Sequence, residues 1–406
     1  MMEKLLQGGK IKIIGINKAY PLPKKAYDLI FSSDYIIGKE EFLSLFDIDK
    51  SKKILLSKNL FEVISFIKEH YKSKNIVILA SGDPNFFGIA ETLRKYIGNE
   101  IEVIPSVSYM QIAFSKANLS WEDASFVSLH GRSIVEILPY IVKGVKKIGI
   151  YTDRINSPDK IAKFLISKGV SGKDYYSFVC EDIGGEEKVF SGYLEDLVDK
   201  EFSYPNILIL KKEREDFEFS FGIDDELFFK EKNMITKKEI RVIVLSYLNL
   251  NKAKIFWDIG AGSGSISIEA SKIMRNGMVY AIEKDENKID CILKNIKKFS
   301  AVNVEIIKGE APEILSFLPQ PDRIFIGGSG GKFKEILEVS FDKLEEDGIL
   351  ISNIVTVDNL SYVISFAKSK NIKYKILSLN ISKAEDIKNI RIFKALNPVF
   401  LFYFKK

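Results

Sequence analysis

The chain has 406 residues, enough for two or three domains, and 46% of them are hydrophobic, so sizeable cores can form. The net charge of +5 is mildly basic, and lysines and glutamates are spread along the chain, which favours solvated helix faces over a nucleic-acid-binding stripe. Two cysteines without metal-ligand spacing and only two histidines argue against a disulfide framework, a histidine metal site and a hydrolytic triad. No apolar run reaches about 18 residues, so we expect no membrane span and a cytoplasmic protein.

The first half of the chain alternates short apolar runs with segments of helical periodicity. Strands are predicted at residues 10–15, 34–38, 75–80 and 101–104, and then at 126–129, 147–151, 177–181 and 206–210. Helices are predicted between them, at residues 27–33, 60–71, 90–96, 106–117 and 155–168. Continuous apolar runs such as NIVILA are typical of central parallel strands. The alternation predicts an α/β fold arranged as two lobes.

A run of charges, KKERED, ends this half, and we take residues 213–225 as a linker between a domain of residues 1–212 and a domain of residues 226–406. Thr236 and Glu239 have the spacing of a capping box, so a helix should begin there. The second domain then offers seven strands, at residues 255–257, 278–282, 304–307, 323–326, 348–354, 373–377 and 399–404. This pattern predicts a doubly wound, Rossmann-like α/β sheet.

A glycine-rich turn follows the first strand of the second domain, in the sequence IFWDIGAGSGS. Gly260, Gly262 and Gly264 alternate with the small residues Ala261 and Ser263. Glycines let the backbone approach a ligand closely, because they carry no Cβ and adopt positive φ at little cost. A ligand there would also meet the unpaired N–H groups at the start of the next helix. We therefore predict a cofactor site at this turn.

The glycine spacing leaves two cofactor classes open. A dinucleotide site requires G-x-G-x-x-G, but Ser265 occupies the third glycine position, and the pattern present is G-x-G-x-G. Glu283 ends the next strand, where a carboxylate can accept hydrogen bonds from both ribose hydroxyls in either class. The spacing favours S-adenosylmethionine over a nicotinamide dinucleotide. The remaining alternative is a glycine-rich turn without any ligand.

Two further turns follow predicted strands of the same sheet. Ala311, in the sequence GEAP, stands where an adenine ring could lie, or where a helix simply begins. Gly328, Ser329 and Gly330 belong to the loop GGSGG, which is either a ligand loop or a mobile linker. Because ligands of open α/β sheets bind outside the carboxyl ends of the strands, these turns together indicate a site more strongly than any one of them.

The first domain carries weaker signals at its strand ends. Gly82 and Asp83 follow a central strand, and a buried aspartate there could orient an amine or ribose of a cofactor, although a plain turn is the simpler explanation. Arg132 follows another strand and could hold a carboxylate through a bidentate fork, or lie on the surface. The sequence names no metal ligand and no catalytic acid or base.

Motifs along nearly the whole chain resemble a known family. Residues 10–212 are similar to the tetrapyrrole methylase domain that methylates carbon 5, through LASGDPNFFG (79–88), IPSVSYMQIAFSKANLSWED (104–123), SLHGR (128–132) and CEDIGGEEKVFSGYLEDL (180–197). Residues 221–406 are similar to the decarboxylating carbon-15 methyltransferase, through ITKKEIR (235–241), WDIGAGSGS (257–265), KGEAPEIL (308–315), FIGGSGG (325–331) and LNPV (396–399). Together they resemble the fused precorrin-6Y carbon-5,15-methyltransferases (decarboxylating) of cobalamin biosynthesis.

The resemblance implies a two-lobed tetrapyrrole methylase domain followed by a seven-stranded class I methyltransferase domain. It implies S-adenosylmethionine as the cofactor. The implied cofactor residues are Thr236, Gly260, Ala261, Gly262, Ser263, Gly264, Glu283 and Ala311 in the second domain, and Gly82 and Asp83 in the first.

The implied substrate is a reduced tetrapyrrole, a precorrin or cobalt-precorrin, whose carboxylates would lie near Arg132 and the loop that contains Gly328, Ser329 and Gly330. Methylation at carbons 5 and 15, with loss of the ring-C acetate as CO₂, would give a precorrin-8 type product. The resemblance also implies homo-oligomers, while we expect no nucleic-acid, metal or membrane partner.

The loop after the first strand departs from the family pattern. That family usually carries a glycine-rich loop there, but residues 15–21 read GINKAYP, and Lys18 and Tyr20 stand where small residues would admit a ligand. One alternative is therefore a first domain that serves as a binding or assembly module without activity. In the other, the second domain alone acts as a methyltransferase, on a tetrapyrrole or on RNA.

Overall fold

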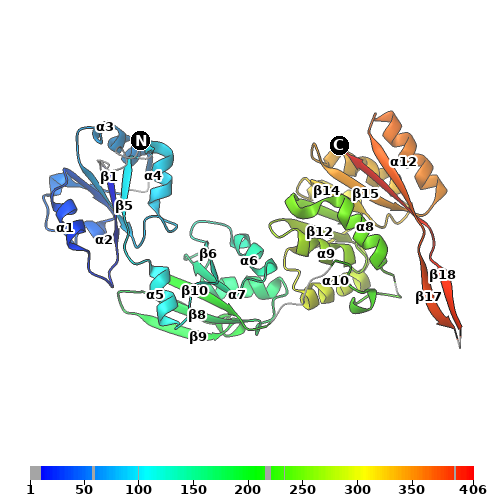
Figure 1. Cartoon of the computed structure of the whole chain (residues 1–406), viewed down its shortest axis with the longest axis horizontal. Helices are drawn as coiled ribbons and strands as arrows, with labels where there is room; N and C mark the ends of the chain where they lie inside the picture. Colours follow the sequence, from blue (N-terminus) through cyan, green and yellow to red (C-terminus); the bar gives the residue numbers. More distant parts are fainter. Residues whose placement is uncertain (1–10, 57–59, 99, 215–220, 233, 388–389) are drawn as a thin grey trace. The chain divides into compact units, whose positions relative to one another are not determined.

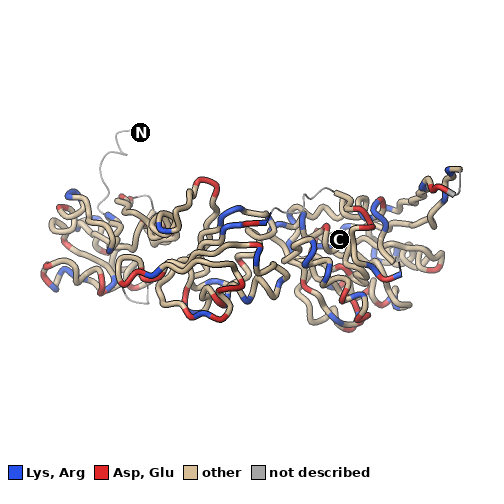
Figure 2. Tube along the Cα trace, turned by 90° about the horizontal axis from the view of Figure 1, so that it is seen from below, with Lys and Arg blue, Asp and Glu red and all other residues tan. Residues whose placement is uncertain are grey.

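The computed structural model describes residues 11–56, 60–98, 100–214, 221–232, 234–387 and 390–406. Residue 10 of the first predicted strand and residues 215–220 of the predicted linker lie outside them. The chain forms two compact units, one of residues 1–134, 146–161 and 176–211, the other of residues 135–145, 162–175 and 212–406. No helix among the described residues has both the length and the hydrophobicity that a membrane span needs. Basic and acidic residues are mixed along both units (Figure 2).

A parallel five-stranded sheet opens the first unit (Figure 1). Its strands, in the spatial order β3-β2-β4-β1-β5, are β1 (Ile11–Ile16), β2 (Tyr35–Gly38), β3 (Lys53–Leu55), β4 (Ile76–Ser81) and β5 (Ile101–Ile104). The helices of this stretch are α1 (Lys24–Phe31), α2 (Glu40–Leu43), α3 (Leu60–His70) and α4 (Ile89–Ile97). The central strands β1 and β4 bury apolar side chains in a separate core on each face, as the continuous apolar sequence of β4 predicted.

The second sheet of the N-terminal half mixes parallel and antiparallel strands in the order β6-β7-β10-β8-β9. Its strands are β6 (Ala124–Ser128), β7 (Lys147–Tyr151), β8 (Tyr175–Glu181), β9 (Lys188–Tyr193) and β10 (Asn206–Lys212). The helices of this stretch are α5 (Tyr109–Lys116), α6 (Leu138–Val142) and α7 (Pro158–Ser167). Helix α5 begins in a capping box formed by Ser108 and Gln111. The two predicted lobes correspond to these two sheets.

The C-terminal half contains the predicted seven-stranded sheet, in the order β13-β12-β11-β14-β15-β19-β16. Its strands are β11 (Ile255–Ile259), β12 (Met278–Glu283), β13 (Val304–Lys308), β14 (Arg323–Ile326), β15 (Ile349–Ile354), β16 (Tyr374–Leu379) and β19 (Val399–Lys405). The first five strands in chain order are parallel, whereas β19 runs antiparallel to both β15 and β16. All seven predicted strands are therefore confirmed.

Helices cover both faces of this sheet and bury one core on each side. The helices are α8 (Lys238–Leu248), α9 (Ser265–Ile273), α10 (Glu286–Phe299), α11 (Phe333–Lys343) and α12 (Val357–Ser369). Helices α8, α9 and α10 contribute to one core, and α11 and α12 to the other. The architecture is the doubly wound α/β sheet that the alternation of strands and helices predicted.

A two-stranded hairpin was not predicted. It consists of β17 (Ser382–Ile387) and β18 (Ile390–Ala395), which pair antiparallel and project from the seven-stranded sheet (Figure 1). Charged and apolar residues are interspersed in both strands, and β18 is exposed along its whole length, including Phe393. No continuous apolar run marks such strands, because they bury no face in a core.

The predicted capping box at Thr236 and Glu239 is wrong. Helix α8 begins at Lys238, and its N-terminal cap, Lys237, makes no side-chain capping bond. Glu239 uses its Oε1 to pair with Lys383 Nζ at 2.8 Å, instead of reaching back to the backbone of Thr236. The spacing of a capping box is a local sequence signal. Here the Glu239 carboxylate, which the capping box would need, instead pairs with Lys383 on the distant strand β17.

A fully buried ion pair joins α8 to α9. Arg241 and Glu269 are both 0% exposed, and Arg241 Nε donates to Glu269 Oε1. Glu269 also accepts from the backbone N–H groups of Gly222 and Ile223, at 2.9 and 3.1 Å. Arg241 Nη1 donates to the carbonyl oxygen of Thr236 at 2.6 Å. The pair therefore fixes the segment before α8 against the helix that follows the glycine loop.

We predict that Arg241→Met destabilises the protein by about 3–5 kcal/mol, because it leaves the Glu269 carboxylate buried and unpaired. The double variant Arg241→Met/Glu269→Leu should recover part of that loss. Urea unfolding of the full chain measures both effects. Lys294→Ala serves as the control, because its ion pair with Asp290 is exposed and contributes at most about 1 kcal/mol. A loss equally small for Arg241→Met would contradict the role given to the buried pair.

Candidate functional site

The loops that follow β11, β12 and β14 lie together at one edge of the C-terminal sheet. The N–H groups of Gly260 and Ala261 both donate to the carbonyl oxygen of Ile282 in β12, at 3.0 Å each. The N–H of Gly327 donates to the carbonyl oxygen of Ile259 at 2.9 Å. Because these strands are parallel neighbours, their carboxyl ends meet at the same edge. The turns that the sequence singled out are therefore neighbours in space.

The three glycines of the loop after β11 meet different surroundings. Gly260 has φ +72°, and a Cβ there would lie 2.4 Å from the carbonyl oxygen of Gly328, so the two loops can touch only without a side chain. Gly264 has φ +74°, and its Cβ would lie 3.1 Å from Ile292 of α10. Gly262 has φ +59°, and its Cβ would meet only the Gly260 carbonyl oxygen, at 4.0 Å. The space beside Gly262 is therefore open to a ligand.

Glu283, which is 6% exposed, ties the glycine loop to the end of β12. Its Oε2 accepts from the N–H of Gly262 at 2.9 Å. Its Oε1 accepts from the N–H groups of Lys284 and Asp285, at 2.9 and 3.1 Å. A carboxylate has about four acceptor sites, two on each oxygen, so these three bonds leave Oε2 with room for one more hydrogen bond. Glu283 therefore shapes the loop besides offering acceptors to a ligand, and the sequence predicted only the second role.

Ser263 carries a hydroxyl without a hydrogen-bond partner, although the residue is only 4% exposed. Its carbonyl oxygen is held by the side-chain amide of Asn295 on α10 at 2.8 Å. An unpaired buried hydroxyl costs on the order of 1–3 kcal/mol. Together with the open space at Gly262 and the acceptors of Glu283, it fits a ligand that carries sugar hydroxyls and a polar end.

Asp258, one residue before the end of β11, is a buried carboxyl whose role the sequence did not reveal. It is 1% exposed, and burial raises its pKa to about 7, although the hydroxyl of Ser267 on α9 donates to its Oδ2. The nearby charge of Glu283 also raises the pKa of Asp258. An acidic residue directly before a glycine-rich loop was the only available signal, and a pattern cannot give the degree of burial.

Thr236 and Ala311 reach the site by different routes. Ala311 is buried in the core on the α11 side, and the preceding Gly309 donates its N–H to the carbonyl oxygen of Glu283 at 3.1 Å. This turn therefore lies directly beside Glu283. Thr236 precedes α8, and its carbonyl oxygen accepts a hydrogen bond from Arg241. Its link to the glycine loop thus runs through Arg241 and helix α9.

Ion pairs connect the turns that follow β12, β13 and β14. Glu310 accepts from Lys284 at 2.8 Å and from Lys332 at 3.4 Å, and Lys332 also pairs with Glu313 at 2.8 Å. These hydrogen bonds with Lys284 and Lys332 lower the pKa of Glu310. A Cβ on Gly330, in the loop with Gly328 and Ser329, would lie 3.4 Å from Lys284 Nζ. Two cations therefore stand beside this glycine-rich loop.

In the first unit, three strand-end loops meet at Gly15. A Cβ there would lie 2.0 Å from the carbonyl oxygen of Gly82 and 2.6 Å from the nitrogen of Ser106. Gly82, with φ +61°, donates its N–H to the carbonyl oxygen of Ile16 at 2.8 Å. Asp83 accepts from the N–H of Asn85 at 2.9 Å, as in a turn. Gly82 and Asp83 therefore lie at the carboxyl ends of β1, β4 and β5.

The loop of residues 15–21 is packed rather than open. Lys18 Nζ pairs with Glu41 of α2 at 3.1 Å, and the N–H of Lys18 donates to the hydroxyl of Tyr109 at 3.3 Å. A Cβ on Gly184, in the turn after β8, would lie 2.9 Å from Lys18 Cβ. Tyr20 is exposed. Lys18 therefore packs against the second sheet of this unit and pairs with α2.

Arg132 lies in the exposed loop after β6. The N–H of Gly131 donates to Asp153 Oδ2 at 2.8 Å, and Asn156 Nδ2 donates to the carbonyl oxygen of Arg132 at 3.0 Å. Both partners follow β7, which pairs in parallel with β6. The backbone that carries Arg132 is therefore fixed at the carboxyl ends of two strands, the edge at which the sequence predicted a carboxylate-binding cation.

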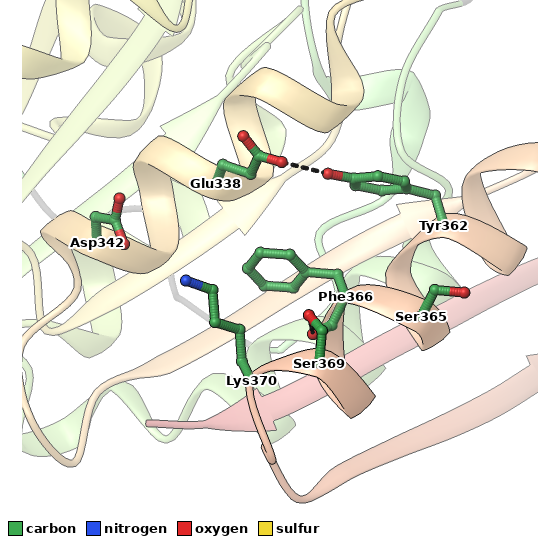
Figure 3. Close-up of a pocket in the computed structure, with 7 residues that line it drawn as sticks. All are labelled: Glu338, Asp342, Tyr362, Ser365, Phe366, Ser369 and Lys370. Atoms are coloured by element: carbon green, nitrogen blue, oxygen red, sulfur yellow. Dashed lines mark hydrogen bonds between the residues drawn. The ribbon is translucent and has the colours of Figure 1, made fainter.

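A groove of about 490 Å³ lies between α11 and α12, away from the glycine loops (Figure 3). It is lined by Glu338, Asp342, Tyr362, Ser365, Phe366, Ser369 and Lys370. The hydroxyl of Tyr362 donates to Glu338. Because α11 runs back from the carboxyl edge of the sheet, Asp342 lies near its far end. Among the described residues, no group of three or more His, Cys, Asp or Glu side chains is placed to hold a metal ion.

Comparison with known proteins matches both halves of the chain. The family described as tetrapyrrole (corrin/porphyrin) methylases matches residues 14–198, and the family described as precorrin methyltransferase domain matches residues 227–406. A relative from Sinorhizobium sp., named precorrin-6Y C(5,15)-methyltransferase [decarboxylating], is 31% identical over 330 residues, which cover 80% of this chain and 78% of the relative.

Two further relatives align with part of the chain. A Saccharolobus solfataricus protein, named a probable cobalt-precorrin-6B C(15)-methyltransferase (decarboxylating), is 37% identical over 44% of this chain and 93% of its own length. The crystal structure of a precorrin-6Y C5,15-methyltransferase from Geobacter metallireducens is 40% identical, covers 46% of this chain and 97% of its own, and superposes with a TM-score of 0.44.

We predict that Asp258→Asn changes the pH dependence of stability. The raised pKa means that the folded chain binds more protons than the unfolded chain between about pH 4 and 7. The contribution of Asp258 to stability is therefore complete below about pH 4 and is lost as the pH rises to about 7. The variant lacks this loss, so its free energy of unfolding relative to wild type should rise from pH 5 to pH 8, on the order of 2 kcal/mol.

Urea unfolding of both proteins at the two pH values measures this change. Asp347→Asn is the control, because that exposed carboxyl pairs with Lys405 and its pKa is lowered, not raised. A difference between Asp258→Asn and wild type that stays the same at pH 5 and pH 8 would show that Asp258 is ionised with an ordinary pKa.

Proposed function

The chain belongs to the family of precorrin-6Y C(5,15)-methyltransferases (decarboxylating), and from this membership we propose that it methylates one precorrin-6 type tetrapyrrole at carbons 5 and 15 and removes the ring-C acetate as CO₂. The product would be a precorrin-8 type tetrapyrrole. The observation that carries the proposal is the cluster of strand-end loops in the half that matches the precorrin methyltransferase domain, with open space at Gly262 and an unpaired hydroxyl on Ser263.

We assign one reaction to each half of the chain. Residues 1–212 would methylate carbon 5, because the tetrapyrrole methylase family matches residues 14–198. Residues 226–406 would methylate carbon 15 and release CO₂, because the precorrin methyltransferase domain matches residues 227–406 and the relative from Saccharolobus solfataricus, whose name specifies carbon 15 alone, aligns over a similar length of 185 residues. Residues 213–225 would link the two. Assembly into homo-oligomers is part of the same proposal.

We propose S-adenosylmethionine as the ligand of the loop after β11. Glu283 would accept hydrogen bonds from the ribose hydroxyls: Oε2 has room for one beside its bond to Gly262, and a second would take the place of one backbone N–H on Oε1. The hydroxyl of Ser263 would donate to the carboxylate of the methionine part, which supplies its missing partner. Ala311 would pack beside the adenine, and Thr236 would help to close the site from the segment before α8. In the first half, Gly82 and Asp83 would lie beside a second cofactor molecule.

The chemistry requires alignment more than acid–base catalysis. S-adenosylmethionine would supply a methyl group bound to a positively charged sulfur. An electron-rich carbon of the macrocycle would receive this methyl group in line with the carbon–sulfur bond. The glycine loops contribute by fixing the backbone close to the reacting groups and by excluding water. No side chain has to accept a proton for the methyl transfer itself. An apolar, desolvated pocket would favour decarboxylation of the ring-C acetate, because it destabilises the ionised carboxylate. The carboxyl group would leave as CO₂, its bonding pair would pass to the remaining carbon and the macrocycle, and a proton would complete the methyl group left on ring C.

Basic side chains near both proposed sites suit a substrate with several carboxylates. Lys284 and Lys332 stand beside the loop that contains Gly328, Ser329 and Gly330, and Glu310 neutralises them in part. A substrate carboxylate could replace Glu310 as their partner. Arg132 would serve the first half in the same way, because its guanidinium can bind a carboxylate through two hydrogen bonds.

The packed loop of residues 15–21 favours a second candidate for the first half. Lys18 and Tyr20 stand where the family usually has small residues, and Gly184 packs closely against Lys18. In this alternative, the first half binds or assembles without transferring a methyl group. The number of S-adenosylmethionine molecules bound per chain distinguishes the two candidates.

We predict that Gly262→Val removes one of two S-adenosylmethionine sites per chain. Valine at φ +59° is strained, and its branched side chain would occupy the space proposed for the cofactor. Calorimetric titration of the full chain should give two sites for wild type and one for the variant. Gly98→Val is the control, because Gly98 has φ +86° and open surroundings outside the proposed sites, so two sites should persist.

Unchanged binding by Gly262→Val would disprove the assignment of the loop. A wild-type chain with a single site that the variant abolishes would support the alternative in which the first half has no activity.

A further inference from the structure

Phe87 has an unusual backbone conformation for its residue type. Eight non-glycine residues in the described part of the chain have positive φ, and Phe87, with φ +53°, is the only apolar one among them. The other seven are Asn118, Asp182, Lys232, Asn249, Ser300, Asp347 and Asn371. Asparagine and aspartate tolerate this region because their short polar side chains bond locally, but a bulky ring gains nothing there and strains the backbone. Such strain persists where the surroundings impose it, and it concentrates at functional sites.

The loop around Phe87 is tight and internally hydrogen-bonded. Gly88 approaches Pro84 so closely that a Cβ would lie 2.4 Å from the Pro84 carbonyl oxygen. The same oxygen accepts from the N–H of Ala90 at 3.2 Å, and the N–H of Phe86 donates to the carbonyl oxygen of Asp83 at 3.0 Å. These bonds close the chain between β4 and α4 into a compact turn. Phe87 is therefore held in its conformation by the same turn that contains Asp83.

The ring of Phe87, which follows β4 of the first sheet, contacts a residue of the second sheet. Its centroid lies 6.0 Å from the ring of Tyr151 at the end of β7, and 5.0 Å from the ring of Phe86. Both neighbours meet it at steep angles, 73° and 70°, so neither is stacked parallel to it. Burial raises the pKa of Tyr151 to about 12, so the Tyr151 side chain beside Phe87 is neutral at physiological pH.

Nearly half of the Phe87 side chain, 45%, is exposed, in contrast to the rest of this aromatic cluster. Phe86 and Tyr151 are partly buried and pack against the core beside the second sheet. Arg132 follows β6, which pairs in parallel with β7, so its loop lies at the same edge as Tyr151. An exposed aromatic face and a cation at one edge complement a flat apolar ring system that carries carboxylates at its rim.

We propose that Phe87 is a positioning residue for the first half, the platform against which one face of the tetrapyrrole macrocycle rests during methylation of carbon 5. The inference depends on the proposed function of that half. It explains why a strained and exposed ring is placed four residues after Asp83, in the same turn: the platform would set the height of the macrocycle above the proposed cofactor site. The macrocycle would cover the part of the ring that is now exposed and would be held in plane by carboxylate contacts at its rim.

The test compares full-length variants in carbon-5 methylation at varied tetrapyrrole concentration. Phe87→Gly removes the ring and also the strain, so its melting temperature should hold or rise while the KM for the tetrapyrrole increases about tenfold. Tenfold corresponds to about 1.4 kcal/mol, within the range measured for stacking of flat rings on aromatic side chains. The kcat and the affinity for S-adenosylmethionine should change less than about threefold, and Phe87→Tyr should restore the KM. Phe61→Ala is the control, because Phe61 is an exposed ring on α3 outside this loop, and its KM should equal that of wild type.

The outcomes separate the inference from the function on which it depends. A wild-type chain that leaves carbon 5 unmethylated overturns both. A wild-type chain that methylates carbon 5, with a Phe87→Gly variant of unchanged KM, overturns the platform alone. A Phe87→Gly variant that loses affinity for S-adenosylmethionine instead would place the ring against the cofactor and would equally overturn the platform.

Discussion

The buried pair of Arg241 and Glu269 is the constraint on which the C-terminal half depends. A carboxylate and a guanidinium without solvent are tolerated only when their remaining hydrogen-bonding atoms are satisfied. Here the backbone of Gly222, Ile223 and Thr236 supplies those partners. The segment before α8 must therefore remain against α9, the helix whose N-terminus follows the glycine loop. The motif ITKKEIR thus contributes a structural arginine, Arg241, and the hydrogen bond from Arg241 to the Thr236 carbonyl oxygen helps to position Thr236.

A shared device shapes the proposed sites in two different sheets. Gly15 is the last residue but one of a central strand of the first sheet, and Gly260 follows a central strand of the C-terminal sheet. In each place a Cβ would collide with the backbone of a neighbouring strand-end loop, at 2.0 Å from Gly82 and at 2.4 Å from Gly328. Contact between loops at the carboxyl edge of a parallel sheet requires the absence of a side chain there. These two glycines therefore serve loop-to-loop packing, and the open space proposed for the ligand lies beside Gly262.

The sequence predicted the elements that bury apolar faces and missed those that depend on distant partners. All seven strands of the C-terminal sheet were predictable because each carries apolar residues that lie in or against a core, whereas β17 and β18 are unusual in that β18 is exposed along its whole length. The order of the strands and the position of β19 between β15 and β16 could not be derived from periodicity. The capping box failed because Lys383 takes the carboxylate of Glu239. Asp258 was overlooked since its raised pKa arises from burial, and the positive φ of Phe87 has no signature in the sequence.

The central claim is that one chain carries two separable methyl-transfer sites for one substrate, and mass spectrometry of the tetrapyrrole product tests it most directly. The full-length wild-type chain should add two methyl groups and release one CO₂. Asp83→Ala should remove one methyl gain and leave the decarboxylation, whereas Gly262→Val should remove the other methyl gain together with the CO₂ loss. A wild-type product with a single methyl gain, or two variants that lose the same methyl group, would contradict the account.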